Sequence, residues 1–305
     1  MIKHLIDIES LTGDDIRFFL KQTHRFIVNN ELIPNPKPLL QNKTIVNLFF
    51  EDSTRTLYSF EVAEKKLGAH AINFNAKYSS LNKSETLHDT VLNLAAIGAD
   101  CFIVRHPENG SAKKMAEMLK DEVCIINGGD GTGEHPTQAL LDIFTILQHK
   151  PKLEDLSVAI IGNIKHSRVA HSLIAALQKL GTRDIRTAGL PELMPVQSNT
   201  KVFDNLEQAI KNVDVIVMLR IQRERLAEDL NIDLITYFQQ WGLTEEKLKL
   251  AKLDAIVMHP GPMNREVEIA SSVADGPQSV IFEQPRNGVA VRMAVLSALL
   301  THHYS

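Results

Sequence analysis

Short runs of apolar residues alternate with longer amphipathic stretches along the chain. Apolar runs with the length of a strand lie at 44–50, 69–74, 101–105, 122–127, 156–162, 213–219 and 254–260. Between them, apolar positions recur with a helical period, which predicts helices over 54–67, 86–97, 111–120, 137–149, 167–180 and 205–211. Strands that alternate with helices are typical of an α/β protein with mainly parallel sheets.

The chain length favours two domains over one. Its 305 residues exceed the size at which a single hydrophobic core stops growing, roughly 250–300 residues. Pro151 prevents a helix from continuing into 150–156, so this segment is the best candidate for a linker. The last stretch, 288–305, is so apolar that we expect a helix that packs back on the N-terminal domain. The expected fold class is α/β, with two domains that each hold a mainly parallel sheet flanked by helices.

Composition narrows the classes of function. Lys and Arg number 33 against 37 Asp and Glu, a net charge of −4, whereas a general nucleic-acid surface needs a basic excess. Asp7 and Glu9 interrupt the first apolar residues, so we expect no signal peptide. No apolar run approaches the ~18–20 residues needed to cross a bilayer. We therefore expect a cytoplasmic protein that binds neither nucleic acid nor membrane.

The two cysteines indicate neither a disulfide nor a metal site. Cys101 and Cys124 each lie in an apolar run, so both are expected to be buried and reduced. No Cys-x-x-Cys or His/Cys spacing suggests zinc. We expect no metal and no cofactor.

The first candidate for chemistry follows the strand at 44–50. Ser53, Thr54, Arg55 and Thr56 stand where this strand opens into a helix. The first N–H groups of a helix lack partners and carry about half a positive charge, so hydroxyls and an arginine there are suited to hold a phosphate. The plainer alternative is that Ser53 only caps the helix while Arg55 is solvated. No Walker pattern is found, which argues against a nucleoside triphosphate.

Two further strand ends carry a cation or donor groups. Arg105 closes the strand at 101–105, at the end where α/β sheets bind ligands. His135 and Gln138 lie at the start of the helix at 137–149. Taken singly, His135 is more simply a histidine near a helix start. Three such strand ends in one half of the chain favour an anion site.

The second half repeats this arrangement with other residues. Arg168 follows the first strand of this half, and Arg220 and Gln222 follow the strand at 213–219. Arginine binds carboxylates through paired hydrogen bonds, so two arginines at strand ends suggest a dicarboxylate, unless both are surface residues. Gly162 stands alone where a dinucleotide fingerprint has three glycines, so NAD is not expected.

Two loops offer weaker signals. Gly261 and Pro262 belong to a Pro-Gly-Pro turn after the last predicted strand, and such a turn is suited to present backbone carbonyls. Lys83 lies in a polar loop at 75–85. On its own, Lys83 is most simply a solvated lysine.

Together these segments resemble the aspartate/ornithine carbamoyltransferase family, and within it the catalytic chains that use aspartate. FFEDSTRT, VRHP, HPTQALLD, IKHSRVAHS, LRIQRERL and MHPGPMNREVEI occur in the order and spacing of those chains, from about Leu5 to the C-terminal helix. STRT with HPxQ marks the whole family. LRxQ and HPxP distinguish the aspartate enzymes from the ornithine enzymes, which typically have HCLP.

The resemblance implies transfer of the carbamoyl group of carbamoyl phosphate to L-aspartate, which gives N-carbamoyl-L-aspartate and phosphate in pyrimidine biosynthesis. The carbamoyl phosphate site would consist of Ser53, Thr54, Arg55, Thr56, Arg105, His135, Gln138, Gly261 and Pro262. The catalytic groups among them would be Arg55, Thr56, Arg105 and His135. Aspartate would be bound by Lys83, Arg168, Arg220 and Gln222.

The resemblance also implies an organisation of domains and subunits. The implied domains are a carbamoyl-phosphate-binding domain at 1–135 with the helix at 288–305, an interdomain helix at 136–149 and an aspartate-binding domain at 150–287. Ser79 and Lys83 match a loop that in the family reaches the active site of a neighbouring subunit, which implies a homotrimer with shared sites. A regulatory chain or another enzyme of the pathway is a possible further partner.

Some residues depart from the family pattern, and two alternative functions stay open. Leu57, Ser84, Glu134 and Asn163 stand where arginine, glycine, glutamine and aspartate are usual. Leu57 should point away from the anion site, because two positions past Arg55 correspond to about 200° around a helix. Glu134 is the least favourable, since a carboxylate repels an anionic substrate. The alternatives are a carbamoyltransferase with another acceptor, such as ornithine, and an inert homologue that acts as a structural partner.

Overall fold

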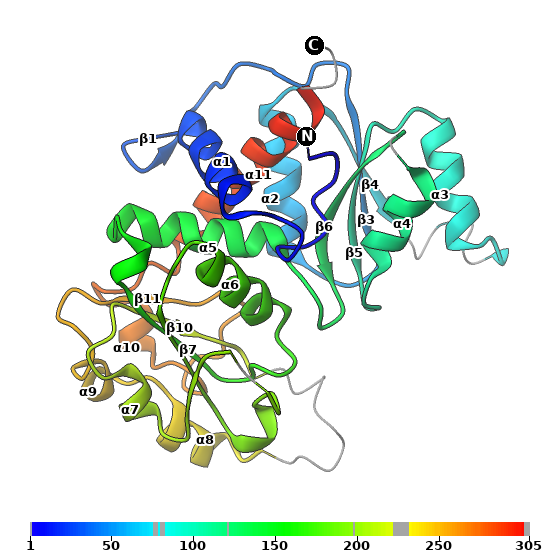
Figure 1. The fold of residues 1–305 in the computed structure, drawn as a ribbon. Coiled ribbons are helices and arrows are strands. Elements are labelled where there is room, and N and C mark those ends of the chain that lie inside the picture. The colour runs from blue at the N-terminus through cyan, green and yellow to red at the C-terminus, as the bar shows by residue number, and fades with distance from the viewer. Residues whose placement is uncertain are drawn as a thin grey trace. The chain divides into compact units, whose positions relative to one another are not determined.

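A computed structural model describes residues 2–75, 79, 83–120, 122–197, 199–221 and 232–301. The chain forms two compact units, each with its own sheet (Figure 1). Unit 1 takes in the described parts of Met1–Leu141 and Pro285–Ser305, and unit 2 those of Asp142–Gln284. The predicted fold class, two α/β domains with mainly parallel sheets, is confirmed.

Unit 1 is built around a four-stranded parallel sheet in the order β4-β3-β5-β6. Its strands are β3 (Thr44–Phe49), β4 (His70–Asn75), β5 (Cys101–His106) and β6 (Cys124–Asp130). The chain runs from β3 to β4 on one side and later to β5 on the other, so its connections diverge between β3 and β5. In α/β sheets, ligands bind at the carboxyl ends of the strands beside such a switch point.

Helices cover both faces of this sheet. Alternate residues of β3 and β5, such as Val46 and Phe102, form one hydrophobic cluster with α3 (Leu87–Ala96) and α4 (Ser111–Leu119). Figure 1 shows α2 (Thr54–Lys66) on the other side of the sheet, beside the C-terminal helix α11 (Glu283–Thr301).

Contacts of α11 explain why the C-terminal segment folds with unit 1. The guanidinium carbon of Arg292 lies 4.8 Å from the centroid of the Phe60 ring on α2. Arg286 donates to a carboxylate oxygen of Glu31 at 2.8 Å. The predicted packing of the C-terminal helix on the N-terminal domain is therefore confirmed.

The remaining elements of unit 1 are short or lie near the N-terminus. They are α1 (Gly13–Thr23), a 3-10 turn (His24–Phe26) and the strands β1 (Ile27–Val28) and β2 (Glu31–Leu32). Strands β1 and β2 form an antiparallel hairpin. The two residues between them, Asn29 and Asn30, have φ angles of 51° and 61°, which asparagine tolerates better than most residues.

A polar group is buried between α2 and the sheet of unit 1. The Glu64 side chain, on α2, accepts a hydrogen bond from Asn47 Nδ2 at 3.1 Å, and the same amide donates to Asn73 Oδ1 at 2.9 Å. Glu64 has no solvent exposure. Burial raises the pKa of Glu64 to about 8, because removal from water disfavours the ionised form.

Unit 2 has a five-stranded parallel sheet in the order β11-β10-β7-β8-β9. Its strands are β7 (Ser157–Ile161), β8 (Asp184–Ala188), β9 (Lys201–Phe203), β10 (Val215–Met218) and β11 (Ile256–Met258). The chain builds β7, β8 and β9 outward on one side and then adds β10 and β11 on the other. The switch point of unit 2 therefore lies between β7 and β10.

Most helices of unit 2 are short. They are α6 (Arg168–Lys179), α7 (Leu206–Ile210), α8 (Leu234–Trp241), α9 (Glu245–Leu248) and α10 (Ser271–Ala274), with 3-10 turns at Leu153–Asp155 and Pro191–Leu193. Apolar residues from this part of the chain join the strands in one core cluster that includes Ile161, Ile216 and Trp241.

The segment 150–156 belongs to unit 2 and is not a linker. Leu153 and Leu156 are buried, and Lys150 forms an ion pair with Asp254 at 2.5 Å. The chain instead passes between the units within α5 (Pro136–His149) and again at residues 284–285. Pro151 marks the end of α5, and the chain after it packs directly into unit 2.

The cysteines and the single tryptophan lie in different units. Cys101 and Cys124 face each other in register on β5 and β6, and both are buried free thiols, as expected. Burial raises the pKa of Cys101. Trp241 ends α8 in unit 2 and is 5% exposed. Among the described helices, none has the length and apolar character to cross a membrane.

Candidate active site

The start of α2 carries the STRT segment, and its cap position is unusual. Ser53 occupies the N-cap, but its side chain accepts no hydrogen bond from the first turn of α2. By contrast, the cap side chains of six other helices each accept such a bond: Thr12, Thr86, Ser167, Asn205, Asp233 and Thr244. The cap bond expected in the plainer alternative is therefore absent, whereas Arg55 is exposed, as that alternative also expected.

The four residues of the segment differ in exposure. Thr54 and Arg55 are exposed, Ser53 is half-buried and Thr56 is 6% exposed. A hydroxyl with no role in the helix cap and an exposed guanidinium stand next to the first N–H groups of a 13-residue helix. This arrangement is suited to bind an anion.

Arg105 lies beside this segment, at the carboxyl end of β5. It pairs in register with Phe49 of β3, and its carbonyl oxygen accepts a hydrogen bond from the Phe50 N–H at 2.8 Å. Arg105 Nε is 2.9 Å from Glu51 Oε1, and Nη1 donates to the Gly128 carbonyl at 3.0 Å. The switch point of unit 1 therefore brings Arg105 and the start of α2 together.

Glu51 is a residue of this site that was not predicted from the sequence. Its carboxylate binds Arg105 from the same loop that carries Ser53, so it fixes the guanidinium relative to the start of α2. The sequence does show that Glu51 closely follows the strand at 44–50. It does not show that this strand pairs with β5, which carries Arg105, because strand pairing cannot be read from the order of strands along the chain.

His135 and Gln138 lie at the start of α5 and are 3% and 8% exposed. Asp130 holds the loop that leads to them, since its carboxylate accepts from the Glu134 N–H at 2.9 Å and from the Gly110 N–H at 2.7 Å. One oxygen of Glu134 accepts from the Ile8 N–H at 3.4 Å. This bond draws that oxygen towards the N-terminal segment.

In unit 2, two of the predicted arginines lie at its switch point. Arg168 is the first residue of α6, follows β7 and is 5% exposed. Ser167 caps the same helix by accepting from the Ala170 N–H at 3.2 Å. Arg220 follows β10 and is half-buried. Gln222 lies outside the described residues.

The departure at Asn163 also lies after β7. Its side-chain oxygen accepts a hydrogen bond from the His166 N–H at 3.2 Å and lies 3.0 Å from His166 Nδ1. Asn163 is 1% exposed, so its amide is part of the interior. It shapes the loop before Arg168 through acceptor contacts that an aspartate would also make.

Gly261 and Pro262 lie in the turn 259–264, directly after β11. Gly261 has a φ of 71°, a left-handed conformation that favours glycine, and the Gly261-Pro262 peptide bond is cis. His259 Nδ1 accepts a hydrogen bond from the Gly261 N–H at 2.8 Å. His259 Nε2 is 3.1 Å from Glu268 Oε1, and both side chains are fully buried.

Ser79 and Lys83 lie in the loop after β4. Lys83 is exposed and Ser79 is half-buried. Ser84 has a φ of 69°, so the serine occupies a left-handed conformation at the position where the family has glycine. The assignment of Ser79 and Lys83 to a neighbouring subunit stays a prediction.

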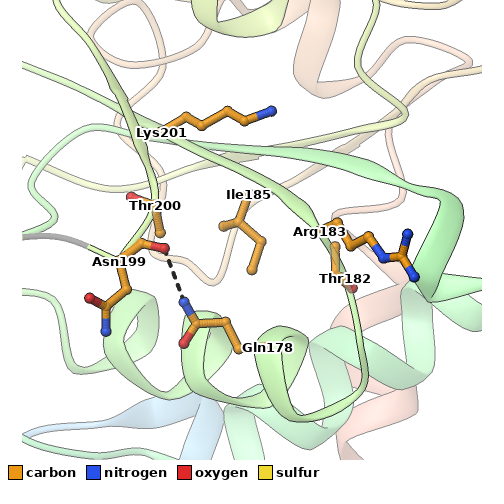
Figure 2. Close-up of a pocket in the computed structure, with 7 residues that line it drawn as sticks. All are labelled: Gln178, Thr182, Arg183, Ile185, Asn199, Thr200 and Lys201. Atoms are coloured by element: carbon orange, nitrogen blue, oxygen red, sulfur yellow. Dashed lines mark hydrogen bonds between the residues drawn. The ribbon is translucent and has the colours of Figure 1, made fainter.

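A separate hollow of about 340 Å³ lies at the amino ends of β8 and β9 (Figure 2). Its lining is polar: Gln178, Thr182, Arg183, Ile185, Asn199, Thr200 and Lys201. Several of these groups are already bonded within the protein. Gln178 Nε2 donates to the Asn199 carbonyl at 3.3 Å, and Lys201 Nζ is 2.8 Å from Asp184 Oδ1. The hollow lies at the amino ends of the strands, whereas ligands of α/β sheets bind at the carboxyl ends, so we do not assign the substrate to it.

No group of three or more His, Cys, Asp or Glu side chains within the described ranges is arranged to hold a metal ion. The described side chains that follow the strands at the two switch points include cations and hydroxyls. Such groups bind anions and stabilise negative charge on oxygen.

Comparison with known proteins identifies both units. Residues 3–148 match the family described as aspartate/ornithine carbamoyltransferase, carbamoyl-P binding domain, and residues 154–299 match the Asp/Orn binding domain of the same family. Both units thus belong to a carbamoyltransferase, an enzyme. This chain belongs to the aspartate/ornithine carbamoyltransferase family.

Solved structures with either acceptor specificity are similar to this chain. Aspartate transcarbamoylase from Trypanosoma cruzi, in complex with carbamoyl aspartate and phosphate, is 31% identical with a TM-score of 0.84, and the match covers 98% of this chain and 96% of that one. Ornithine carbamoyltransferase from Pyrococcus furiosus is 29% identical with a TM-score of 0.86, and the coverage is 99% and 98%. These similarities are nearly equal, so the acceptor must be argued from the residues of unit 2.

Proposed function

We propose that this enzyme transfers the carbamoyl group of carbamoyl phosphate to the amine of L-aspartate. The observation that carries the choice of acceptor is the charge at the switch point of unit 2. Among the described residues, the segments 162–168 and 219–221, which directly follow β7 and β10 at this switch point, contain no Asp or Glu. They contribute Lys165, Arg168 and Arg220 instead. The one carboxylate bonded to the turn after β11, Glu268, is fully buried and accepts hydrogen bonds from that turn.

This charge pattern suits aspartate better than ornithine. The side chain of aspartate ends in a carboxylate, which arginine binds through paired hydrogen bonds. The side chain of ornithine carries a second amine, and its recognition before transfer would need an acidic or carbonyl-rich surface. A buried arginine such as Arg168 repels an ammonium group and attracts a carboxylate.

The phosphate of carbamoyl phosphate is assigned to the start of α2. Ser53 and Thr54 supply hydroxyls, Arg55 supplies a cation, and the first N–H groups of the helix supply further donors. The unused cap of Ser53 supports this assignment, since that hydroxyl is not engaged by the helix itself. The net charge of −4 is thus overridden locally by cations at both switch points.

The reaction needs stabilisation of one oxygen and a path for one proton. The aspartate amine forms a bond to the carbamoyl carbon, negative charge builds on the carbamoyl oxygen, and the bond to the phosphate oxygen then breaks. Thr56, Arg105 and His135 are the groups assigned to that oxygen, and loss of one such donor typically costs ~10²–10³-fold in rate. The proton of the amine goes to the departing phosphate.

Product analysis with alternative acceptors tests this proposal. The enzyme is incubated with carbamoyl phosphate and either L-aspartate or L-ornithine, and the carbamoylated product and free phosphate are both quantified. We expect N-carbamoyl-L-aspartate and phosphate in equal amounts. Product with ornithine alone would establish the other acceptor, and no product with either would leave the chain as an inert homologue.

Matched arginine variants locate the acceptor site. Arg220→Ala should raise the KM for aspartate at least about tenfold, while the KM for carbamoyl phosphate changes much less. Arg183 provides the control, because it is an exposed arginine of the same unit that lies at the amino end of β8. Arg183→Ala should leave both constants unchanged.

We further propose a cytoplasmic homotrimer that acts in pyrimidine synthesis, with Ser79 and Lys83 reaching the site of a neighbouring subunit. Exposed apolar side chains on unit 1 support a protein contact there: Tyr58 and Val62 on α2 are 59% and 41% exposed, and Ile72 on the edge strand β4 is 45% exposed. Residues four apart on a helix share a face, so Tyr58 and Val62 are neighbours.

Complementation tests the shared site. Arg55→Ala and Lys83→Ala variants should each be inactive, and mixed trimers of the two should regain activity, because some sites then contain neither substitution. The mass of the native particle, alone and in extract, would show the trimer and any regulatory chain or pathway enzyme bound to it. A particle of monomer mass with full activity would contradict the shared site.

A further inference from the structure

The turn 259–264 contains a buried histidine that binds its own backbone. The Gly261 N–H donates to His259 Nδ1 at 2.8 Å, so Nδ1 must carry a lone pair. The proton of the neutral ring is then on Nε2. That atom therefore donates to Glu268 Oε1, 3.1 Å away.

Glu268 joins the two ends of the turn. Its Oε1 accepts from His259 at the start of the turn and from the Asn264 N–H, 2.5 Å away, at its end. The Glu268 side chain is fully buried, as is that of His259. Hydrogen bonds to a buried carboxyl group are costly to break, so the two bonds to Glu268 hold the turn in one conformation.

These bonds fix two peptide planes. A peptide group is planar, and in the trans form its N–H and C=O point in opposite directions. The bond from Gly261 N–H therefore points the Pro260 carbonyl away from the buried ring, and the bond from Asn264 N–H points the Met263 carbonyl away from Glu268. The carbonyls of Gly261 and Pro262 lie between these two fixed planes.

We propose that His259 and Glu268 are positioning residues that aim the carbonyls of this turn at an N–H donor of the substrate. The inference rests on the proposed function, in which that donor is the amine of the carbamoyl group. Neither side chain contacts the substrate. Both act through the backbone, so their loss should weaken recognition of the carbamoyl amine and spare recognition of phosphate.

Binding of two ligands that differ by the carbamoyl group isolates this role. Inorganic phosphate and carbamoyl phosphate are titrated into the full-length enzyme by calorimetry, and the ratio of their dissociation constants is compared between variants. In His259→Gln, the amide nitrogen stands near the position of Nε2, so the variant keeps a donor for Glu268 but loses the acceptor for the Gly261 N–H. In His259→Asn, the amide oxygen stands near the position of Nδ1, so the variant keeps that acceptor but loses the donor for Glu268. We expect carbamoyl phosphate to bind His259→Gln at least about tenfold more weakly, with phosphate binding changed less than about twofold.

A second pair of variants separates position from charge. Glu268→Gln keeps an acceptor oxygen for both donors, whereas Glu268→Ala removes it. The preference for carbamoyl phosphate over phosphate should persist in Glu268→Gln and fall about tenfold in Glu268→Ala. The matched control is His149, whose Nε2 lies 3.0 Å from Glu283 in the same unit but outside the turn. His149→Gln should keep the wild-type ratio.

The possible outcomes distinguish this inference from the proposed function. Folded His259→Gln and Glu268→Ala variants that keep the wild-type ratio would overturn the inference and leave the proposed function intact. If Glu268→Ala does not fold, the two His259 variants decide. A wild-type enzyme that transfers no carbamoyl group and binds carbamoyl phosphate no better than phosphate would overturn both.

Discussion

Ser53 and His259 each follow the carboxyl end of a strand, yet their side chains are used in opposite ways. Ser53 leaves the cap of α2 unused, and the neighbouring Arg55 is exposed. His259 is fully buried and uses both ring nitrogens to bind the protein itself. In the proposed function, the first turn offers side-chain donors to an anion, whereas the second turn uses side chains to hold backbone acceptors. A substitution in the first should therefore affect activity, and one in the second should also affect stability.

The largest expected effect is that of Arg55→Ala on turnover. Loss of the exposed cation should lower kcat/KM at least ~10³-fold, because the phosphate loses a charged partner in the transition state. The unfolding free energy should stay within about 0.5 kcal/mol, as is usual for an exposed position. Arg17→Ala, at an exposed arginine of α1, is the control for both measurements. Near-normal turnover in Arg55→Ala would contradict the assignment of the phosphate to the start of α2.

Glu64→Gln sharpens the comparison between two buried carboxyl groups. Glu268 accepts two hydrogen bonds, whereas Glu64 accepts one from Asn47, and its pKa is raised to about 8. Unfolded glutamate ionises near its ordinary pKa, so between about pH 5 and pH 8 the folded protein holds the extra proton. The contribution of Glu64 to stability should therefore be fully present below about pH 5 and be lost as the pH rises through this window.

The amide introduced by Glu64→Gln cannot ionise, so this pH dependence should disappear in the variant. At about pH 9, the variant should be more stable than the wild type by about 4–5 kcal/mol, and near pH 5 the two should be similar. Urea unfolding at several pH values measures the difference. A parallel pH dependence of both proteins would mean that another group is responsible.

Glu268→Ala should lower stability where Arg55→Ala does not. Its removal leaves the buried His259 without an acceptor and also removes the acceptor of the Asn264 N–H, which should cost about 2–3 kcal/mol in the unfolding free energy. Glu268→Gln should cost much less, because it keeps the acceptor. Equal stability of the Ala and Gln variants would show that these hydrogen bonds do not hold the turn.

The smallest effect compares two helix caps in unit 1. Thr12 accepts from the Asp15 N–H at 3.1 Å within a capping box, so Thr12→Ala should destabilise the protein by about 1 kcal/mol without changing activity. Ser53→Ala should change stability by less than about 0.5 kcal/mol and weaken carbamoyl phosphate binding several-fold. Thermal unfolding and calorimetry give the two readouts. A loss of about 1 kcal/mol of stability in Ser53→Ala would show that the Ser53 side chain does cap α2.

The strands that could be predicted are those with continuous apolar runs. All the runs identified in the sequence became strands of the two parallel sheets. Most of these strands are buried, and a strand covered on both faces needs apolar residues throughout, whereas the edge strand β4 is largely exposed. β8 and β9 were missed. β8 is as long as β7, so its length is not the reason. The polar residues of β8 and β9, such as Asp184, Arg186 and Lys201, form ion pairs with one another that only the fold creates.

Site residues could be predicted where neighbouring residues in the sequence act together. They could not be predicted where a side chain depends on a partner that is distant in the sequence. The STRT segment could be recognised because four adjacent residues share one helix start. The pair Arg105 and Glu51 needed the register of β3 against β5, and the pair His259 and Glu268 needed the path of a turn. Helix α1 was also missed, although its capping box is visible in the sequence at residues 12–15.

The placement of Cys101, Cys124 and Trp241 gives each unit its own optical reporter. Both thiols are buried in unit 1, so a thiol reagent reacts only when that unit opens. The only tryptophan of the chain, Trp241, is buried in unit 2. Fluorescence excited at the long-wavelength end of tryptophan absorption, where tyrosine does not absorb, therefore reports on that unit alone. Whether substrates stabilise one unit before the other can thus be followed in the unmodified protein, without adding a label.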